Sequence, residues 1–529
     1  MDPLITALLR PEAHEPPEQA VELLETHISW ILFAGERAYK LKKPVNLGFV
    51  DFSSPERRAW TCAEELRLNR RLAPELYLAV VPVHGPRAEA SFHGDGPVIE
   101  MAVMMRRFPQ SALLPAALSR GAVPPQAFLA LATRLAAFHA HAAVAGSDDP
   151  WGEPEAVRRP AFANLQVLEQ QQQAAAQSDS ELVAPLRRWT EAEAQRLEPL
   201  FRQRKADGRV RECHGDLHLG NMALLEGRIE VFDCLEFSPE LRWIDVISDL
   251  AFLAMDLQQR GQDASAQLLL AQWLEASGDY GGLALWRWYC VYRALVRAKV
   301  AALRLAQADL CAAEAGELQS SLRAYLRWAA QRIQPRAGSL VITHGVSGSG
   351  KSHWARRLAQ RPSWLQLRSD LERKRRFGLW GEPQDPLPPP DPASMYSSEV
   401  SRWLYRERLL GCSEAALAAG FDVVVDATFL CRSDRQAYRD LAGRLGARFA
   451  VLACSCPEAE ARTRVESRSR QGGDPSDADA AVLARQLAVI EPIEEGERQT
   501  LGPVLEASER GLEELERMLA SAPALGCGS

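Results

Sequence analysis

One eight-residue segment constrains the fold of this chain more than any other feature. Residues 345–352 read GVSGSGKS, which matches the pattern G-x-x-x-x-G-K-[ST], and the apolar run LVITH precedes them at 340–344. Glycines allow such a loop to turn its backbone N–H groups toward phosphate oxygens, and the helix that follows adds positive potential at its N-terminus. A strand that leads through a glycine loop into a helix begins an α/β unit. The segment therefore predicts a phosphate-binding loop beside a parallel sheet.

The residues of this loop have separate expected tasks. Lys351 reaches the β- and γ-phosphates of a nucleotide, and the hydroxyl of Ser352 is a ligand for Mg²⁺. The remainder of the loop offers its backbone to the phosphates. We expect nucleotide contacts from Gly345, Ser347, Gly348, Ser349, Gly350, Lys351 and Ser352.

Two carboxylates follow the loop at positions that suit phosphoryl transfer. Asp370 comes 18 residues after Ser352 at the expected end of a strand, Arg373 lies one helical turn beyond it, and Asp426 ends the apolar run VVVD. A carboxylate near the γ-phosphate can accept the proton of an incoming hydroxyl, and a strand-end carboxylate can hold Mg²⁺. We expect Asp370 and Arg373 to be catalytic and Asp426 to be a metal ligand; the alternative for Asp370 is a helix cap beside a solvated arginine.

Arginines of the segment 462–470 form a further candidate group. Arg464 and Arg468 are one helical turn apart and precede the glycine-containing sequence QGGD at 471–474. Mobile arginines can close over phosphates and neutralise the charge that develops during transfer. We expect Arg464 and Arg468 to contact the nucleotide, although arginine-rich helix faces are often only solvated.

The chain changes its pattern near residue 335, where the sequence QPRAGS interrupts a long helical region. Beyond this point short apolar runs alternate with segments of helical periodicity, which is typical of a doubly wound parallel sheet. We therefore place a domain boundary at about 335 and predict an α/β P-loop domain over 336–529.

A second motif lies in the first part of the chain. Residues 214–221 read HGDLHLGN, which fits H-x-D-x-x-x-x-N, and Asp233 follows twelve residues after Asn221 at the end of a strand-like run. This set supplies a base for a substrate hydroxyl, an amide oxygen for one metal ion and a carboxylate for another. We assign Asp216 as the base and Asn221 and Asp233 as Mg²⁺ ligands, with His214 bracing the loop. A zinc site is disfavoured because no HExxH helix occurs.

The region before residue 335 predicts two lobes. Residues 25–108 read as strands around one helix, and residues 109–335 are mostly helical with short strands near 209–213 and 228–232. This arrangement predicts an α+β bilobal domain over 1–335.

The motifs of this domain resemble those of the aminoglycoside phosphotransferase and choline kinase superfamily, over about 25–330. The resemblance implies a protein-kinase-like fold in which a strand lysine grips phosphates and pairs with a helix glutamate. Lys40 and Lys42 point to the same strand face, so either could serve, with Lys40 preferred; the glutamate is Glu65, with Glu64 as the alternative. One departure is the turn at 34–36, which contains a single glycine.

The C-terminal domain resembles P-loop small-molecule kinases, polynucleotide 5′-kinases and zeta-toxin kinases over about 340–500. The whole chain resembles bacterial two-domain proteins known mainly as predicted kinases. These resemblances imply ATP and Mg²⁺ as cofactors, and they imply a reaction without identifying a substrate.

Composition narrows the setting of this activity. The net charge is −7, which argues against a broad surface for nucleic acid, and ten cysteines in 529 residues are too few for a disulfide scaffold. We find no signal peptide pattern and no run of 18 apolar residues, so we expect a cytoplasmic protein with no membrane partner.

The first hypothesis is a bifunctional ATP·Mg²⁺-dependent phosphotransferase that acts on a hydroxyl of a small molecule at each site. The second makes the P-loop domain a regulatory ATPase for a single kinase. The third makes the C-terminal domain a kinase for nucleic-acid 5′-hydroxyls, which the acidic charge disfavours. The acceptors, the choice between ATP and GTP, coupling between the sites and the oligomeric state stay open.

Overall fold

The computed structural model describes residues 2–17, 20–48, 50–175, 180–307, 310–381, 394–471 and 476–521. The chain divides into two compact units, each considered by itself below. The first comprises Met1–Ala163 and Ala194–Arg260, and the second comprises Asn164–Glu193 and Gly261–Ser529. The second unit therefore includes helices that precede residue 335, and a boundary at 335 between folds remains a prediction.

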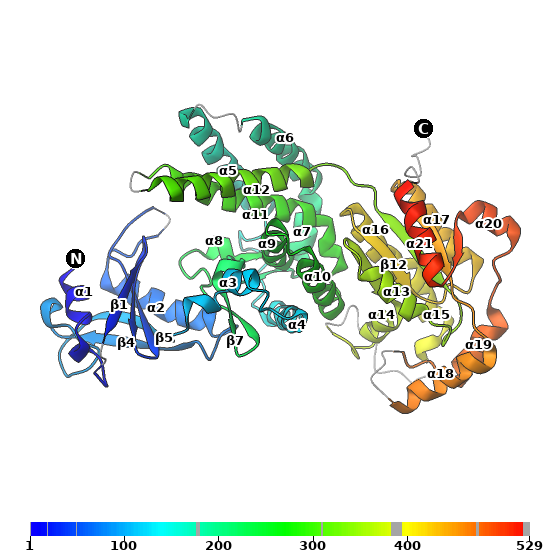
Figure 1. Ribbon diagram of the computed structural model, residues 1–529, viewed down its shortest axis with the longest axis horizontal. Helices are drawn as coiled ribbons and strands as arrows, with labels where there is room; N and C mark the ends of the chain where they lie inside the picture. The colour runs from blue at the N-terminus through cyan, green and yellow to red at the C-terminus, as the bar shows by residue number, and fades with distance from the viewer. Residues whose placement is uncertain are drawn as a thin grey trace. The chain divides into compact units, whose positions relative to one another are not determined.

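The first unit begins with an antiparallel sheet of five strands (Figure 1). Its order is β1-β2-β3-β5-β4, and α2 (Pro55–Asn69) packs against it with Cys62 buried. Ser54 caps this helix by accepting the N–H of Arg57, and Pro55 stands in the first turn, where no N–H is needed. The strands are β1 (Val21–Glu25), β2 (Ser29–Ala34), β3 (Arg37–Lys42), β4 (Tyr77–His84) and β5 (Val98–Arg106).

The remainder of this unit is helical with short hairpins, as the sequence predicts. The helix α9 (Val246–Gln259) is buried from Val246 to Leu257, so apolar side chains surround its two aspartates. The other elements of this part are α3 (Leu114–Ser119), α4 (Pro125–His141), α7 (Glu198–Ala206), β6 (Val210–Glu212), β7 (Met222–Leu225), β8 (Arg228–Val231), α8 (Pro239–Arg242) and β9 (Trp243–Asp245).

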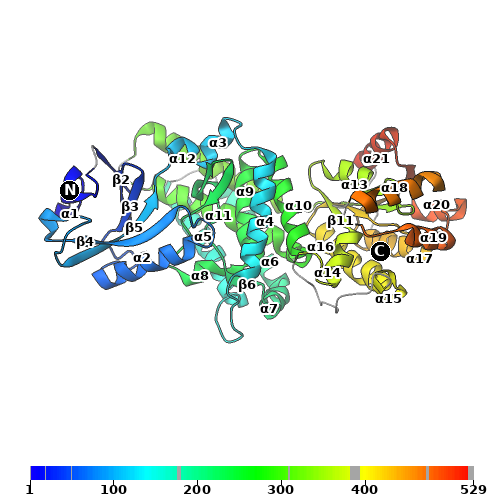
Figure 2. The same ribbon diagram turned by 90° about the horizontal axis from the view of Figure 1, so that it is seen from below.

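The second unit contains helices and a parallel sheet (Figure 2). The helices before the sheet are most of α5 (Pro154–Ala175) and α6 (Ser180–Arg196), then α10 (Asp263–Ser277), α11 (Trp286–Leu305) and α12 (Ala312–Arg332). The helices α11 and α12 pack against each other, and both bury aromatic side chains such as Trp288, Tyr289 and Tyr325. These aromatics therefore belong to the core.

The parallel sheet has the order β11-β12-β10-β13-β14. Its strands are β10 (Ser339–His344), β11 (Trp364–Arg368), β12 (Asp422–Asp426), β13 (Arg448–Ala453) and β14 (Val504–Glu506). One face packs against α13 (Lys351–Ala359) and α21 (Glu509–Ser521), and the other against α16 (Leu409–Ala418) and α17 (Arg432–Arg444). The fold is the predicted doubly wound α/β fold, so the segments after β10, β11 and β12 meet at the carboxyl edge of the sheet.

Further helices flank this edge. They are α14 (Ser369–Arg376), α15 (Ser398–Trp403), a π-helical turn η7 (Leu404–Arg408), α18 (Glu458–Gln471), α19 (Ala480–Val489) and α20 (Glu495–Leu501). Within the part of the chain that the structure describes, no helix is both long and apolar enough to span a lipid bilayer.

Candidate active sites

The glycine loop after β10 has the conformation that its sequence predicts. Gly345, Gly348 and Gly350 have positive φ angles of 146°, 82° and 91°. A Cβ at Gly348 would lie 2.5 Å from the carbonyl oxygen of Ala461, so α18 leaves no room for a side chain there. The loop therefore requires glycine for both its backbone angles and its close approach to α18.

Two groups of the loop are ready for an anion. The Lys351 amine is buried and donates to the loop carbonyl of Val346 at 2.7 Å, and burial lowers the pKa of Lys351. The buried hydroxyl of Ser349 has no hydrogen-bond partner among the described residues. An unpartnered donor and a cation that bonds only a neutral carbonyl fit phosphate oxygens.

Hard oxygen donors lie beside the loop. Ser352 lies in the same cavity as Asp426, where its hydroxyl acts to lower the pKa of this carboxyl, and Gln366 donates to Asp426 Oδ2 at 2.9 Å. Burial raises the pKa of Asp426, and the nearby Lys351 partly opposes this shift. A hydroxyl and a carboxylate are ligand types that Mg²⁺ accepts, so this pair fits the metal that the sequence predicts.

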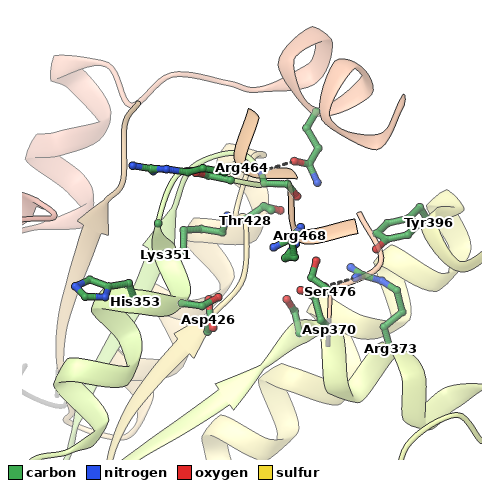
Figure 3. Close-up of a pocket in the computed structure, with 16 residues that line it drawn as sticks. Lys351, His353, Asp370, Arg373, Tyr396, Asp426, Thr428, Arg464, Arg468 and Ser476 are labelled. Atoms are coloured by element: carbon green, nitrogen blue, oxygen red, sulfur yellow. Dashed lines mark hydrogen bonds and ion pairs between the residues drawn. The ribbon is translucent and has the colours of Figure 1, made fainter. Parts of the chain in front are cut away.

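The predicted catalytic pair lies in the same cavity (Figure 3). Arg373 Nη1 donates to Asp370 Oδ1 at 2.8 Å, and the guanidinium lies 4.5 Å from the ring centre of Tyr396. Burial acts to raise the pKa of Asp370, but Arg373, Ser476 and Lys351 outweigh it and hold the pKa below its ordinary value. Asp370 is therefore a carboxylate at neutral pH and can accept a hydrogen bond from a hydroxyl.

Arg464 and Arg468 of α18 line this cavity of about 210 Å³ together with Lys351 and Asp370. Arg464 Nη1 donates to the carbonyl of Gly348 at 3.1 Å. Of the residues predicted for this site, all but Gly345 and Ser349 line the cavity.

Sequence reasoning missed several lining residues. Gln486 of α19 accepts the N–H of Ser347 at 2.7 Å through its side-chain oxygen. The others are His353, Ser369, Tyr396, Thr428 and Ser476. None stands in a recognisable motif, so only the fold could identify them.

The first unit holds a second cluster, centred on Glu65 of α2. Lys40 Nζ lies 2.8 Å from Glu65 Oε1 and 2.7 Å from Asp233 Oδ1, whereas Lys42 Nζ lies 2.6 Å from Glu65 Oε2 and 2.5 Å from Glu236 Oε1. The Lys42 side chain is fully buried, while that of Lys40 is 12% exposed and faces a cavity. Of the two lysines, Lys40 therefore faces the cavity, and its role as the phosphate-binding lysine stays a prediction.

Charge pairing stabilises the charged forms of both lysines in this cluster. Burial acts to lower the pKa of Lys40, but Asp233 and Glu65 outweigh it and raise the pKa well above its ordinary value. Burial raises the pKa of Glu236 despite the adjacent Lys42. The alternative partner Glu64 instead pairs with Arg67 and Arg242, which leaves Glu65 as the glutamate at the lysines.

The loop of residues 214–221, called the HGD segment below, lies beside this cluster. Asn221 Nδ2 donates to Asp216 Oδ2 at 2.9 Å, and His218 Nε2 lies 3.3 Å from the same oxygen. The side chains of Asp216 and Asp233 are 30% and 47% exposed, so both carboxylates reach solvent. An amide oxygen and a partly exposed carboxylate fit Mg²⁺.

Buried aspartates of α9 hold this segment in place. Asp249 accepts the backbone N–H groups of His214 and Gly215, each at 3.0 Å, and Asp256 accepts that of Leu219 at 3.0 Å. Sequence reasoning did not identify either aspartate, because their spacing on an apolar helix matches no motif.

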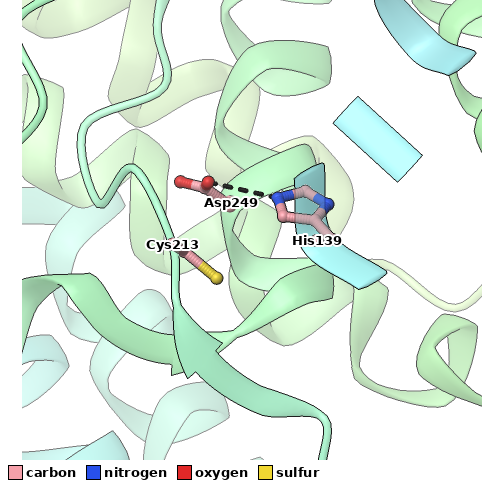
Figure 4. Close-up of side chains that lie close together, drawn as sticks. All are labelled: His139, Cys213 and Asp249. Atoms are coloured by element: carbon pink, nitrogen blue, oxygen red, sulfur yellow. Dashed lines mark hydrogen bonds and ion pairs between the residues drawn. The ribbon is translucent and has the colours of Figure 1, made fainter. Parts of the chain in front are cut away.

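His139, Cys213 and Asp249 form a buried group with metal-ligand chemistry (Figure 4). His139 Nε2 lies 3.3 Å from Asp249 Oδ2, and burial raises the pKa of Cys213 well above its ordinary value. Asp249 is engaged by two backbone N–H groups and lies against His139, so this group braces the HGD segment.

A cavity of about 220 Å³ lies beside Lys40 and Asp233. Its walls are mostly apolar and include residues 105–108 at the end of β5. An apolar cavity beside a lysine has the chemistry that suits a nucleotide base. Large side chains in the wall are Leu24, Ile31, Phe33, Tyr77, Met105, Phe108 and Phe232.

The fold and the two clusters define a phosphotransferase of the kinase type. A family model described as "Phosphotransferase enzyme family" matches residues 37–286, and one described as "AAA domain" matches residues 340–493. The uncharacterized proteins Rv2004c of Mycobacterium tuberculosis and Mb2027c of Mycobacterium bovis are each 31% identical over 476 residues, which is 89% of this chain and 91% of theirs. The chain belongs to this family, which joins a phosphotransferase domain to a P-loop domain.

Solved structures of kinases are similar at low identity. Amicoumacin kinase hAmiN is 17% identical, with 61% of this chain and 91% of that chain covered and a TM-score of 0.37. A choline/ethanolamine kinase family protein from Mesorhizobium loti is 14% identical, with 59% and 92% covered and a TM-score of 0.34. A gluconokinase from Sinorhizobium meliloti 1021 is 21% identical, with 35% and 92% covered and a TM-score of 0.24.

Proposed function

We propose that the protein is a bifunctional phosphotransferase in which each site moves the γ-phosphoryl group of ATP, with Mg²⁺, to a hydroxyl of a small molecule. The observation that best supports this proposal is that each unit has its own lysine to bind phosphate, its own oxygen donors for a metal ion and its own carboxylate to accept a proton from the acceptor. The two sets share no residue.

In the P-loop site, Lys351 and the loop N–H groups bind the phosphates, and Ser352 with Asp426 holds Mg²⁺. Bound Mg²⁺ supplies charge neutralisation on the phosphate oxygens. Asp370 orients the acceptor hydroxyl and accepts its proton, while Arg373 keeps Asp370 ionised.

In the first site, Lys40 binds phosphate and is itself oriented by Glu65. Asp233 and Asn221 hold Mg²⁺, and Asp216 accepts the proton of the acceptor hydroxyl. Asn221 and His218 contact Asp216 Oδ2, so they fix the direction of this carboxylate.

The test uses full-length protein with γ-labelled ATP, Mg²⁺ and a small-molecule extract, read by mass spectrometry. We expect one labelled product to be lost in Lys351→Ala and another in Asp216→Ala. Asp207→Ala, at an exposed aspartate after α7, and Lys43→Ala, near the end of β3, serve as matched controls and retain both products.

Other outcomes decide against the proposal. If neither variant changes any phosphoryl transfer, the proposal fails. Lys351-dependent hydrolysis without a product of that site would indicate the regulatory ATPase instead. Labelling of a 5′-hydroxyl oligonucleotide that depends on Asp370 would indicate the nucleic-acid kinase.

A further inference from the structure

The helix α14 has two functional faces. Asp370 and Arg373 line the P-loop cavity. Glu372 and Arg375 each lie two residues further on, about 200° around the helix, and are 1% and 0% exposed. Glu372 and Arg375 thus form a buried ion pair on the side of α14 away from the cavity. Burying two charges is costly unless further hydrogen bonds stabilise them.

The C-terminal end of α10 accepts such hydrogen bonds. The last carbonyl groups of a helix receive no hydrogen bond from the helix's own N–H groups. Arg375 Nη2 donates to the carbonyl of Glu275 at 2.6 Å, and Arg375 Nη1 donates to that of Ala276 at 3.2 Å. Trp380 Nε1 also donates to the Glu275 carbonyl, at 3.1 Å. Arg375 therefore caps α10 from the P-loop side.

A second arginine extends this contact. Arg408 Nε donates to Glu372 Oε2 at 2.7 Å, and Arg408 Nη2 donates to the carbonyl of Gly278 at 2.7 Å. Glu372 also lies 3.2 Å from Arg375 Nε through the same oxygen. One buried carboxylate thus orients two guanidinium groups, and both reach the end of α10.

Two glycines make the space for Arg375. A Cβ at Gly278 would lie 2.6 Å from Arg375 Nε, and one at Gly381 would lie 2.4 Å from Arg375 Nη1. Both glycines have positive φ, at 70° and 57°. The chain is therefore shaped around this guanidinium from two sides.

Arg408 connects the same contact to the cavity by a second route. It belongs to the π-helical turn η7, which also contains Tyr405. The hydroxyl of Tyr405 lies 2.8 Å from Thr428 Oγ1, and Thr428 lines the P-loop cavity. Such π turns are frequent at functional sites.

We propose that Glu372, Arg375 and Arg408 are positioning residues that fix Asp370 and Arg373 by tying α14 to the end of α10. The segment of α10 then works as part of the P-loop enzyme, although it lies outside the AAA-matched residues 340–493. This inference rests on the proposed activity of the P-loop site.

The test is Arg375→Lys in the full-length protein. Lysine keeps the charge beside Glu372 but cannot bond two carbonyls at once. We expect kcat of Lys351-dependent ATP turnover to fall about tenfold or more, because small misplacements of catalytic groups are costly. The KM for ATP should stay near that of the parent, since Lys351 and the loop are untouched, and circular dichroism should show that the variant is folded. Arg376→Lys, over the ring of Trp403, is the matched control and should change nothing.

Two further measurements decide the remaining cases. Trp380→Phe removes one hydrogen bond to α10 and should lower kcat severalfold without unfolding. Backbone amide exchange of residues 369–376 should quicken in Arg375→Lys while that of 345–352 does not, and this readout holds even if turnover proves independent of Lys351. Unchanged kcat in a folded Arg375→Lys, or unchanged exchange in 369–376, would overturn the inference.

Discussion

At the residue scale, the first site depends on one glutamate between two lysines. Glu65 bonds Lys40 through one oxygen and Lys42 through the other, and each lysine has a second carboxylate of its own. Burying charges is costly unless each is paired, and here the alternation of signs pairs every member. In this arrangement the partly exposed Lys40 is available to a phosphate, whereas the fully buried Lys42 supports Glu65.

Lys42→Met tests the supporting position. It leaves Glu236 buried without its cation, so we expect a loss of about 3 kcal/mol or more in the free energy of unfolding. The double variant Lys42→Met, Glu236→Gln should recover part of this loss, because the uncompensated charge is then gone. Urea denaturation measures both. A single variant as stable as the parent would contradict the assigned role, as would a double variant that recovers nothing.

His214 makes a pH-dependent contribution to stability. Its Nε2 bonds the carbonyl of Phe232 at 3.0 Å and its Nδ1 accepts the N–H of Asp216 at 3.3 Å, so the neutral ring fits. Burial lowers the pKa of His214 below that of a free imidazole, about 6.5, although Asp249 and Asp216 act in the opposite direction.

Between the folded and unfolded pKa values the unfolded chain binds more protons, so stability falls as pH drops below about 6.5. We expect His214→Gln to flatten the dependence of unfolding free energy on pH between about pH 7 and pH 5.5. The exposed His141→Gln is the control. An unchanged slope in His214→Gln would show that this histidine is not responsible.

At the element scale, much of both sites follows from strand ends. The glycine loop, Asp370 and Asp426 each end or follow a parallel strand, and parallel strands bring such residues to one edge. Strand alternation placed Lys40 and Lys42 on the same face but could not separate them, because the difference is burial.

Other contributors could not be predicted from the sequence. Glu236, Asp249 and Gln486 lie far along the chain from the groups that they contact, and each is a single polar residue without a motif. Helix periodicity marks which face is buried, but it does not say which distant backbone N–H a buried side chain will meet. The positions of these residues depend on the packing of whole elements.

Gly348→Ala tests the contact between the P-loop and α18. The added Cβ meets the Ala461 carbonyl at 2.5 Å, at a φ of 82° that alanine rarely adopts. We expect affinity for ATP at the Lys351 site to fall about tenfold or more, because loop and helix must move apart. Titration of a fluorescent ATP analogue, with Lys351→Ala as the background, measures this effect.

Gly316→Ala is the matched control for that substitution. It adds a Cβ on exposed α12, where nothing lies within 4 Å, and should leave affinity unchanged while stabilising the helix by about 0.5–1 kcal/mol. Equal affinity in Gly348→Ala and the parent would mean that the loop does not need its close approach to α18.

At the scale of the whole molecule, the family-matched segments and the compact units divide the chain differently. The phosphotransferase match extends to residue 286, whereas the second unit already begins again at Gly261. The segment 261–286 therefore belongs to the phosphotransferase domain by its family match and to the unit of the P-loop domain by its packing. Arg375 and Arg408 contribute to this packing, because both bond carbonyls of that segment.

Truncation separates these two descriptions. A fragment of residues 336–529 would expose Arg375 and Glu372, which are buried only in the presence of α10. The pair would then gain hydration but lose the hydrogen bonds that orient it, and Tyr280 and Trp286 would no longer cover Arg408 and Phe421. We expect the fragment 336–529 to melt at a lower temperature than the fragment 261–529, and to expose more apolar surface to a dye such as ANS.

Because each kcal/mol of lost stability lowers Tm by about 2–4 °C in a domain of this size, calorimetry resolves the difference. Equal melting temperatures for the two fragments would show that the P-loop domain is complete from residue 336, and that the descent of the segment, not its packing, defines where it belongs.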